Sequence, residues 1–552
     1  MTDYSGGYYL IETPLIKTGI HTHTAELDSP LSQDHLDAVN AVQKTPFMTN
    51  DWIVDIIREA YTHGDVIADL PSADDHPLPK RLSAEEWDAL SDEERAEKKA
   101  ERERIHDLNA KLMGRREALL RKLSLAERLR DKTLYFPSSV DWRGRLYPMP
   151  QDINPQQDDL GKSMLMFANG KPLGKNGAYH LCLRGAATFG MDKVSFEERV
   201  QWFMENEREV IDSARNPLDG RRFWTEADEP WGFLATCREW LGYVEQGEAF
   251  ISHLPIPQDA TCSGLQILSA MGRDSYGAAQ TNVAAGNTRR DLYTIVTDRV
   301  IEIAERDAKD GSDAASRWLG NVTRKTVKRG VMTMPYGVTR AGLRQQFIKD
   351  GHCDALDGHK ARNAEYMTSA LLEAVEGVVR SASTIMQWLQ DCAKALAQQD
   401  EPMDWTTPSG MQVRQAYWKR NKKRVATLYG ECVLWEEEPV MGIDNRRQAL
   451  AAAPNVIHSY DAAHLVNTVN MAKRSGIDDF AMIHDSFATH AGEDTRILGD
   501  ILREEFYHIY KGDPLGDLHR MLSKDGAFDL PQPPSTGDFD ISEVLRSDYF
   551  FS

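Results

Sequence analysis

No internal repeat runs through the 552 residues of this chain, which argues against solenoid and propeller architectures. A single hydrophobic core stops growing at about 250–300 residues, so a chain of this length must divide into several units. At a typical domain size of about 150 residues, three or four units are expected. Short apolar runs alternate with helical patterns in the middle of the chain, which favours an α/β or α+β class.

The composition excludes several classes of protein. With 41% hydrophobic and 27% charged residues, the chain is neither collagen-like nor mostly disordered. No apolar run reaches the roughly 18 residues that span a bilayer, so we expect no membrane partner. The first 30 residues lack the basic and apolar regions of a signal peptide. The six cysteines form no CxxC pair. We therefore expect a reducing compartment, the cytoplasm.

The charge of the chain is strongly acidic but unevenly distributed. The formal net charge of −20 argues, taken alone, against a nucleic-acid partner. However, the windows 321–348 and 414–424 each hold six basic residues and no acidic one, and 101–130 holds nine basic against five acidic residues. Such stripes can contact phosphates even on an acidic protein. For any one stripe, a solvated helix face is the alternative interpretation.

Local signals predict a helical region after an irregular N-terminal arm over 1–30. Helical spacing of apolar residues predicts two helices over 33–61, broken at Pro46. Proline-rich residues 64–80 predict a loop. Ser83 and Ser91 each stand three positions before a glutamate, the capping-box pattern. The second box opens a long, charged and mostly exposed helical projection.

Two short segments combine glycine or small residues with charged ones. Residues 140–147 read VDWRGRLY, in which Arg143 and Arg145 offer two guanidinium forks beside a glycine that permits close approach to phosphate or sugar. A turn with a structural arginine pair is the alternative. Residues 256–266 suit a strand that ends at Asp259, followed by a helix that begins near 262–264. A helix N-cap is the alternative role for this aspartate.

A third segment, 323–337, predicts a helix with a cationic face. Spacing of four residues places Arg324 and Lys328 on the same face. Tyr336 follows where a proline and a glycine must end the helix. Such an element can grip a triphosphate and present an aromatic ring with a hydroxyl to a base or ribose. A basic amphipathic helix with a capping turn is the alternative.

The fourth segment, 480–489, reads FAMIHDSFAT and predicts a buried β-hairpin with Asp485 at its bend. Neither GxSxG nor HExxH occurs to complete a Ser-His-Asp or a zinc site. Asp259 and Asp485, together with the cationic helix and the basic stripes, instead suggest two-metal phosphoryl transfer. Mg²⁺ keeps several waters and uses one or two carboxylates, so two aspartates suffice.

These four segments, in this order, resemble the catalytic motifs of the single-subunit DNA-dependent RNA polymerases of bacteriophages and mitochondria. The resemblance covers nearly the whole chain and implies a right-hand polymerase of helix-rich α+β build with a small antiparallel palm sheet. It implies the following division: an N-terminal arm (1–40), a thumb-like helical region (41–131), the first part of the palm (132–287), fingers with a specificity-type hairpin at about 433–451 (288–458), and the second part of the palm with the C-terminal end (459–552).

The resemblance also implies roles for individual residues. Asp259 and Asp485, with the backbone carbonyl of Ala260, would hold two Mg²⁺ ions, and Lys328 would be the catalytic lysine near the departing pyrophosphate. The implied nucleotide-binding residues are Arg324 and Lys193 for the triphosphate, Tyr336 for stacking and ribose selection, Tyr293 and Gly264 at the nucleotide site, and His458 for the minor groove of the new pair. The implied nucleic-acid contacts are Arg143, Arg145, Lys162, Arg329, Arg446 and Arg447.

The residue at position 264 indicates which polymer is made. Related DNA polymerases carry a glutamate five residues after the first metal-binding aspartate, where it blocks a 2′-hydroxyl. Here that position is Gly264, which leaves room for a ribose, and the Tyr336 hydroxyl can hydrogen-bond to it. The expected activity is therefore synthesis of RNA from NTPs on a DNA template, with DNA, RNA and NTPs as partners.

Two departures from the family leave alternatives open. The chain starts where the family's promoter-binding N-terminal domain should already be ending, so we expect a second polypeptide, a melted template or a truncated sequence. The hairpin region carries Glu436, Glu437 and Glu438, which repel phosphates. Promoter contacts are then left to residues at the hairpin tip, such as Asp444, Asn445, Arg446 and Arg447. A primase-like enzyme, a noncatalytic nucleic-acid-binding subunit and a two-metal nuclease are the rival functions. If the gene is of bacteriophage origin, the compartment is the host cytoplasm.

Overall fold

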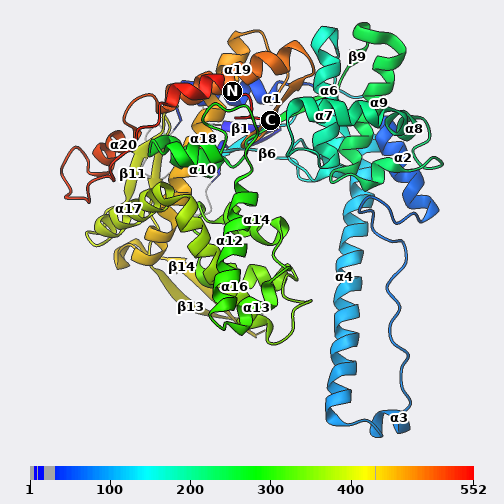
Figure 1. The fold of residues 1–552 in the computed structure, drawn as a ribbon, viewed down its shortest axis with the longest axis horizontal. Helices are drawn as coiled ribbons and strands as arrows, with labels where there is room; N and C mark the ends of the chain where they lie inside the picture. The colour runs from blue at the N-terminus through cyan, green and yellow to red at the C-terminus, as the bar shows by residue number, and fades with distance from the viewer. Residues whose placement is uncertain (1–4, 9, 18–30, 429) are drawn as a thin grey trace.

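The structure, a computed structural model, describes residues 5–8, 10–17, 31–428 and 430–552. It is helix-rich α+β with several small sheets, which confirms the predicted class. One long helix and one helical lobe project in the same direction from a body that holds the central sheet (Figure 1). None of the described helices is both long and apolar enough to cross a membrane.

Part of the N-terminal arm that we expected to be irregular forms strands. β1 (Ser5–Tyr8) and β2 (Ile11–Pro14) make an antiparallel hairpin. β3 (Ile16–Lys17) pairs in parallel with β5 (Ser138–Asp141), which continues antiparallel into β6 (Leu146–Pro148). The rest of the predicted arm, 18–30, lies outside the described residues.

The predicted N-terminal helices are confirmed. α1 (Gln33–Gln43) and α2 (Asp51–His63) flank the break at Pro46, with β4 (Phe47–Thr49) between them. α3 (Ala84–Asp88) begins at the capping box of Ser83, and α4 (Asp92–Arg128) begins at that of Ser91.

Helix α4 is a 37-residue projection held by an extended segment (Figure 1). Its buried side chains lie only in its C-terminal half, from Leu112 onward. Residues 64–83 run alongside it. The Asn109 amide donates to the His76 carbonyl at 3.0 Å and accepts from the His76 N–H at 2.8 Å, and Arg116 donates to the Ser72 carbonyl at 2.6 Å. These polar contacts tie the segment to a helix that offers little apolar surface.

The remaining elements form two groups around two hydrophobic cores. The first group comprises α5 (Asp159–Ser163), β7 (Leu165–Phe167), β8 (Lys171–Pro172), α6 (Gly174–Phe189), α7 (Phe196–Glu205), α8 (Glu207–Arg215), α9 (Pro230–Gln246) and β9 (Ile251–Ser252). The second comprises α10 (Ser263–Met271), α11 (Ser275–Gln280), α12 (Leu292–Lys309), α13 (Asp313–Trp318), α14 (Arg324–Thr333), α15 (Arg340–Lys349), α16 (Lys360–Val378), α17 (Arg380–Ala397), β11 (Met403–Thr406), β12 (Gln412–Gln415), α18 (Asn445–Arg474), α19 (Glu493–Tyr510) and α20 (Pro514–Leu522).

A three-stranded antiparallel sheet lies between these two cores. Its order is β10 (Pro255–Asp259), β16 (Ser486–His490), β15 (Ala481–Ile483). Because side chains alternate along a strand, Met482 and Phe487 join the core of the second group while Ala481 and Ala488 join that of the first. The predicted strand before Asp259 and the predicted hairpin over 480–489 are thus both confirmed.

The prediction of a hairpin at about 433–451 was wrong in position. The hairpin is formed by β13 (Arg420–Thr427) and β14 (Gly430–Glu437). The basic run of the first strand faces the acidic run of the second, with Lys423 Nζ 3.6 Å from a carboxylate oxygen of Glu436. Sequence inspection treated these charge runs separately, although their attraction favours the observed register.

Two of the expected division points also fall inside helices. The point at 458–459 lies within α18, and that at 40–41 lies within α1. A division of the chain by function at these points therefore does not coincide with a break in the backbone structure.

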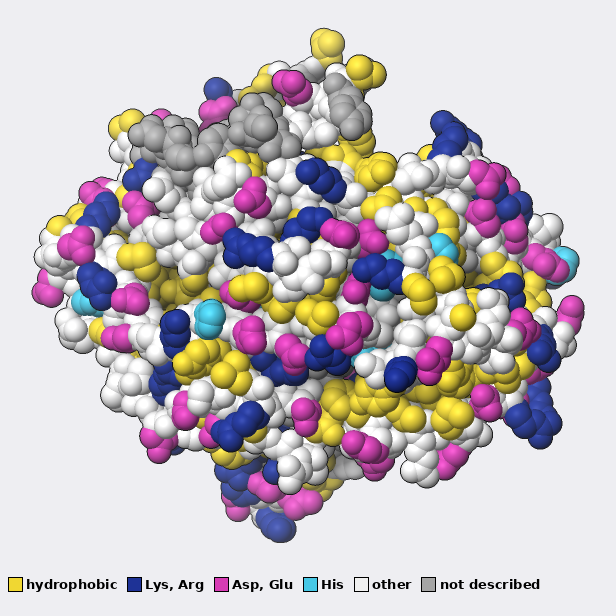
Figure 2. Space-filling model, turned by 90° about the horizontal axis from the view of Figure 1, so that it is seen from above, with side chains coloured by type: hydrophobic (Ala, Val, Ile, Leu, Met, Phe, Trp, Pro, Cys, Tyr) yellow, Lys and Arg dark blue, Asp and Glu magenta, His cyan; other side chains and the backbone are white. Residues whose placement is uncertain are grey.

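Charged side chains are interspersed rather than segregated on the face seen from above (Figure 2). Ion pairs engage much of the basic stripe at 321–348, because Arg329 pairs with Asp350 and both Arg340 and Arg344 pair with Glu365. The interpretation of this stripe as a continuous phosphate-binding surface is therefore weakened, since its cations already have carboxylate partners.

Candidate active site

Strand pairing places the two aspartates at one end of the central sheet. Asp259, the last residue of β10, lies opposite Ser486, the first residue of β16. Asp485 stands in the two-residue turn between β15 and β16, where His484 adopts a φ of +51°. The N–H of Ala260 donates to the carbonyl of Asp485 at 3.2 Å. Two carboxylates from distant parts of the sequence thus share one site.

No cation among the described residues pairs directly with the two carboxylates. Burial raises the pKa of Asp259, and the negative charge of Asp485 raises it further, against a hydrogen bond from Ser486 that lowers it. Ser263 Oγ donates to Asp485 Oδ2 at 2.8 Å. Neither aspartate makes an ion pair with any described residue. Two adjacent, unneutralised carboxylates suit a divalent cation. A cluster of three or more His, Cys, Asp or Glu with metal-binding geometry is absent from the described residues.

Tyr336 lies beside these carboxylates. Helix α14 ends at Thr333, and the positive φ of Gly337 (+73°) completes the turn that carries Tyr336, as predicted. The Tyr336 hydroxyl is 3.4 Å from Ser263 Oγ, and its ring stands 4.8 Å from that of His458. A Cβ on Gly264 would lie 3.4 Å from this hydroxyl and 3.0 Å from Cβ of Pro335. Gly264 and Tyr336 therefore face each other across a narrow space.

Helix α14 carries the two predicted cations in different states. Arg324 is held by Asp291, the N-cap of α12, with Nε 2.6 Å from Oδ2, and its guanidinium lies 5.1 Å from the ring centre of Tyr293. Tyr293 is itself buried beneath it. Lys328 is exposed and makes no ion pair with the described residues. Of these two predicted residues, Arg324 is thus anchored, whereas Lys328 makes no ion pair with the described residues.

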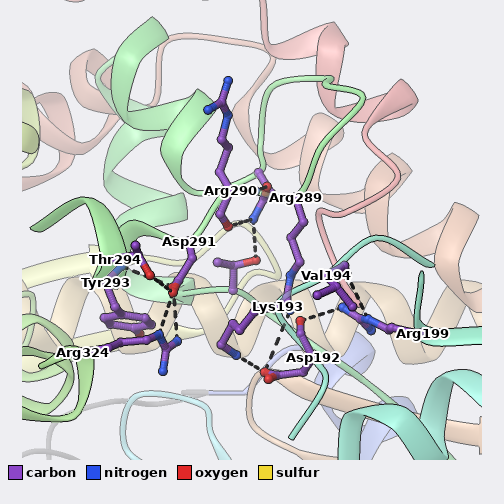
Figure 3. Close-up of polar contacts among 12 residues, drawn as sticks. Asp192, Lys193, Val194, Arg199, Arg289, Arg290, Asp291, Tyr293, Thr294 and Arg324 are labelled. Atoms are coloured by element: carbon purple, nitrogen blue, oxygen red, sulfur yellow. Dashed lines mark hydrogen bonds and ion pairs between the residues drawn. The ribbon is translucent and has the colours of Figure 1, made fainter. Parts of the chain in front are cut away.

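Lys193 lies in a loop that is braced by hydrogen bonds from Arg199 (Figure 3). Its ammonium contacts Asp192, and the buried Arg199 donates to the carbonyls of Asp192 and Val194 at 2.8 and 3.3 Å. Burial and the nearby charges of Arg289, Arg324 and Lys328 lower the pKa of Lys193 to about 7, although Asp291 acts in the opposite direction. The structure therefore brings Lys193 and Arg324 into one electrostatic cluster.

The arginines of the segment 140–147 are occupied by protein partners. Arg143 donates to Asp141 at 2.7 Å and lies 2.7 Å from Nδ1 of His458. Burial, together with Arg145 and Arg143, lowers the pKa of His458 to about 2, so its imidazole is neutral. Arg145 donates to Asp461 at 2.8 and 3.0 Å. With Asp461 only 5% exposed, this is a buried ion pair.

The expectation that Arg145 touches template or hybrid is therefore revised: its guanidinium is used inside the protein. Burial opposes the charge on Arg145, but the Asp461 carboxylate outweighs it and raises the pKa. The segment reads equally well as a turn with a structural arginine pair, the alternative interpretation of its sequence, because a linear pattern does not reveal distant carboxylate partners.

Other predicted contacts are scattered. Lys162 lies near Asp259 in a cavity of about 100 Å³ and is 3.5 Å from Glu229. Arg329 lies on α14 and pairs with Asp350. Arg446 and Arg447 begin α18 rather than the hairpin tip, and Arg447 is held by Glu437 at 3.2 Å. The expectation that they form the tip was wrong because the hairpin ends before them.

Sequence inspection missed several residues that complete the site. Ser263, Asp291 and Asp461 hold, respectively, Asp485, Arg324 and Arg145. Asp291 precedes a helical run and was recognisable as an N-cap, but its second role depends on α14 packing against α12. The others carry no local signal.

Paired carboxylates beside a cationic helix and a tyrosine hydroxyl form the arrangement expected of a nucleotidyl-transfer site. A family model described as DNA-dependent RNA polymerase matches residues 171–527. The chain belongs to this family, which confirms the resemblance to single-subunit RNA polymerases.

Individual relatives of the chain are named DNA-directed RNA polymerases. The chain is 34% identical to DNA-directed RNA polymerase 2B, chloroplastic/mitochondrial, of Nicotiana tabacum, over 99% of this chain and 55% of the relative. It is 35% identical to DNA-directed RNA polymerase 1, mitochondrial, of Arabidopsis thaliana, over 94% of this chain and 54% of the relative. The chain thus spans about half the length of the curated relatives it matches. The POL domain of Pol1 from M. smegmatis, solved with DNA primer-template and dNTP, matches 87% of this chain and 78% of that one at 13% identity and a TM-score of 0.28, too low to describe this fold.

The buried pair generates a stability prediction. Arg145→Met leaves the Asp461 carboxylate buried without a partner and should lower the free energy of unfolding by about 3–5 kcal/mol. The double variant Arg145→Met with Asp461→Leu should recover most of this loss. Denaturant unfolding measures both. Arg496→Met, which removes exposed pairs with Glu493 and Asp500, serves as the control and should change stability by about 1 kcal/mol or less. An Arg145→Met loss as small as the control's would contradict the buried-pair assignment.

Proposed function

We propose that this chain synthesises RNA on a DNA template by adding nucleotides from NTPs to an RNA 3′ end. The observation that carries the proposal is the pair of unneutralised carboxylates, Asp259 and Asp485, next to the cationic face of α14. Family membership supports the same reaction class. A two-metal nuclease would leave Arg324, Lys328 and Tyr336 without a role.

Asp259, Asp485 and the carbonyl of Ala260 would hold two Mg²⁺ ions. The residues fit such ions because they present carboxylate oxygens that make no ion pair with a described residue, although Lys162 lies near Asp259. When bound, the ions would activate the attacking 3′-oxygen and stabilise charge on the leaving pyrophosphate. Ser263 and Ser486 orient the two carboxylates through hydrogen bonds.

The cations would bind and neutralise the triphosphate. Arg324, anchored by Asp291, presents its guanidinium from a fixed position, and Lys193 reaches the same region from its braced loop. Lys328, free of protein partners in the described part of the chain, would approach the departing pyrophosphate. Fixed and flexible cations together would stabilise charge as it moves toward the leaving group.

Gly264 and Tyr336 would lie beside the ribose of the incoming nucleotide. The neutral Tyr336 hydroxyl, whose pKa burial raises to about 12, is a hydrogen-bond donor and acceptor for a 2′-hydroxyl. The ring of Tyr336 and the neighbouring ring of His458 would contact the new base pair. Arg143 positions His458, a role that differs from the direct template contact we first expected.

The remaining assignments extend the same proposal. The projecting α4 would act as a thumb, the central sheet as the palm and the lobe of α12 to α16 as the fingers. Lys162 would contact template or hybrid near Asp259. Promoter initiation would need a second polypeptide or melted DNA. A primase-like enzyme would use the same site, and product length separates it from a transcriptase.

Primer extension on an RNA-primed DNA strand tests the reaction. The chain should extend the primer with NTPs and use dNTPs poorly. Asp485→Asn should abolish extension while template affinity stays within about twofold, because it removes a metal ligand and not a phosphate contact. Divalent metal should raise the melting temperature of the wild type more than that of Asp485→Asn. Extension by Asp485→Asn at the wild-type rate would sink the assignment.

Tyr336→Phe should weaken the preference for NTPs over dNTPs. Loss of a single hydrogen bond corresponds to about three- to tenfold in the ratio of kcat/KM values. Incorporation of dNTPs should stay unchanged and is the internal control. Gly264→Glu should act in the same direction and reduce NTP use more than dNTP use, since its side chain would occupy the space beside the hydroxyl. Unaltered discrimination in both variants would exclude this space as the ribose pocket.

Lys193 should make NTP affinity depend on pH. Because its pKa in the folded protein is about 7, the side chain loses its charge as pH rises from 7 to 9, and KM for NTPs should increase. Lys193→Met should show a higher KM at pH 7 and a flatter profile over the same range. The substrate titrates equally for both proteins, so the difference between the profiles reports the lysine. Parallel profiles would contradict a charged Lys193 in NTP binding.

A further inference from the structure

Arg289 is a buried cation whose role the proposed reaction does not yet explain. It lies in the loop before α12, two residues ahead of Asp291, and its side chain is only 8% exposed. Its Nε and Nη1 atoms are buried and have no hydrogen-bond partner among the described residues. The nearest ion-pair partner is Asp192, at 3.9 Å. A guanidinium that is buried but unsatisfied is strongly unfavourable unless another group completes it.

The loop that carries Arg289 is clamped against the metal-binding segment. The Asn282 side chain accepts from the N–H of Arg290 at 2.8 Å and donates to its carbonyl at 2.9 Å. The same amide donates to Thr261 Oγ1 at 3.0 Å, two residues after Asp259. These bonds, visible in part in Figure 3, hold the backbone of the loop in one place. The backbone position of the loop that carries Arg289 is therefore fixed by these hydrogen bonds.

The surroundings of Arg289 carry more positive than negative charge. Asp192 serves both Lys193 and Arg289, and Asp291 is already engaged by Arg324. Burial lowers the pKa of Arg289 to about 10, with Asp291 and Asp259 acting against the positive charge of Arg324. The guanidinium therefore senses the charges of both the carboxylate site and α14. Four cations (Lys193, Arg199, Arg289 and Arg324) face three carboxylates (Asp192, Asp291 and Asp259), which leaves the cluster short of an anion.

We propose that Arg289 is a phosphate-binding residue for the polyphosphate of the incoming NTP and of the departing pyrophosphate. This inference rests on the proposed function. An arginine guanidinium donates charge-assisted hydrogen bonds to phosphate oxygens, and the Nε and Nη1 atoms of Arg289, on two different edges of the group, carry N–H groups without a partner among the described residues. The Asp192 carboxylate attracts the Arg289 guanidinium but, at 3.9 Å, is too distant to accept a hydrogen bond from it.

Steady-state primer extension with the chain, at saturating primer-template, tests the proposal. Arg289→Gln should raise KM for NTPs by about tenfold or more, the range for a lost charge-assisted hydrogen bond. It should raise the inhibition constant of pyrophosphate by a similar factor. Arg289→Lys, which keeps the charge and loses the fork, should fall between. Arg290→Gln is the matched control, because the neighbouring Arg290 side chain is exposed, and should stay within about twofold of wild type.

Thermal unfolding provides a second readout that does not need activity. Without ligand, Arg289→Gln should melt no lower than wild type, because the variant removes an uncompensated buried charge. Inorganic pyrophosphate with Mg²⁺ should raise the melting temperature of wild type and Arg290→Gln more than that of Arg289→Gln. A lower melting temperature without ligand, combined with an unchanged pyrophosphate shift, would assign Arg289 a structural role and overturn the proposal.

Two further outcomes separate this inference from the proposed function. If Arg289→Gln weakens primer-template binding and leaves KM for NTPs unchanged, Arg289 contacts nucleic-acid phosphates and the proposal is wrong. If the wild type extends no primer, the proposed function fails, and the pyrophosphate-induced melting shift still decides whether Arg289 binds polyphosphate.

Discussion

The pairing of β10 with β16 is the interaction on which the rest of the site depends. It brings Asp259 to the turn that holds Asp485, and the sheet can occupy this place only because each of its faces meets a different hydrophobic core. A slip of one residue in this pairing would exchange the two faces and separate the carboxylates. The apolar packing of Phe487 on one face of the sheet and of Ala488 on the other therefore offsets the repulsion between the two carboxylates.

Around this pair of aspartates, several charged side chains lack a full set of partners within the protein, and hydrogen bonds hold them in position. Carboxylates that make no ion pair in the described part of the chain lie near cations that outnumber their own carboxylate partners. Hydrogen bonds from serine, asparagine or buried arginine hold the segments that carry both kinds of charge. Such an arrangement lowers the stability of the chain alone and favours binding of a metal-bound polyphosphate. The buried Arg145–Asp461 pair differs, because each of its members completes the other within the protein.

Local structure was predictable wherever a short segment carried its own signal. The capping boxes at Ser83 and Ser91, the helix over 324–333 and the hairpin around Asp485 all arise from contacts within a few residues. The position of the exposed hairpin was not predictable in this way, because its register depends on charges of opposite strands. The positions of α1 and α18 across the expected division points were not predictable from local signals either.

The sequence by itself determined the chemistry that the site can offer: two aspartates, a cationic helix face, a glycine where a side chain would block a ribose, and the order of the motifs that identifies the family. Only the tertiary structure decided which charges remain available. Arg143, Arg145, Arg324 and Arg447 look like free cations in the sequence, yet each pairs with a carboxylate in the folded protein, and Arg289 emerges as an unsatisfied cation among the described residues. The reason is physical: whether a charge binds a ligand depends on its burial and on partners brought close by folding, and neither is encoded in neighbouring residues.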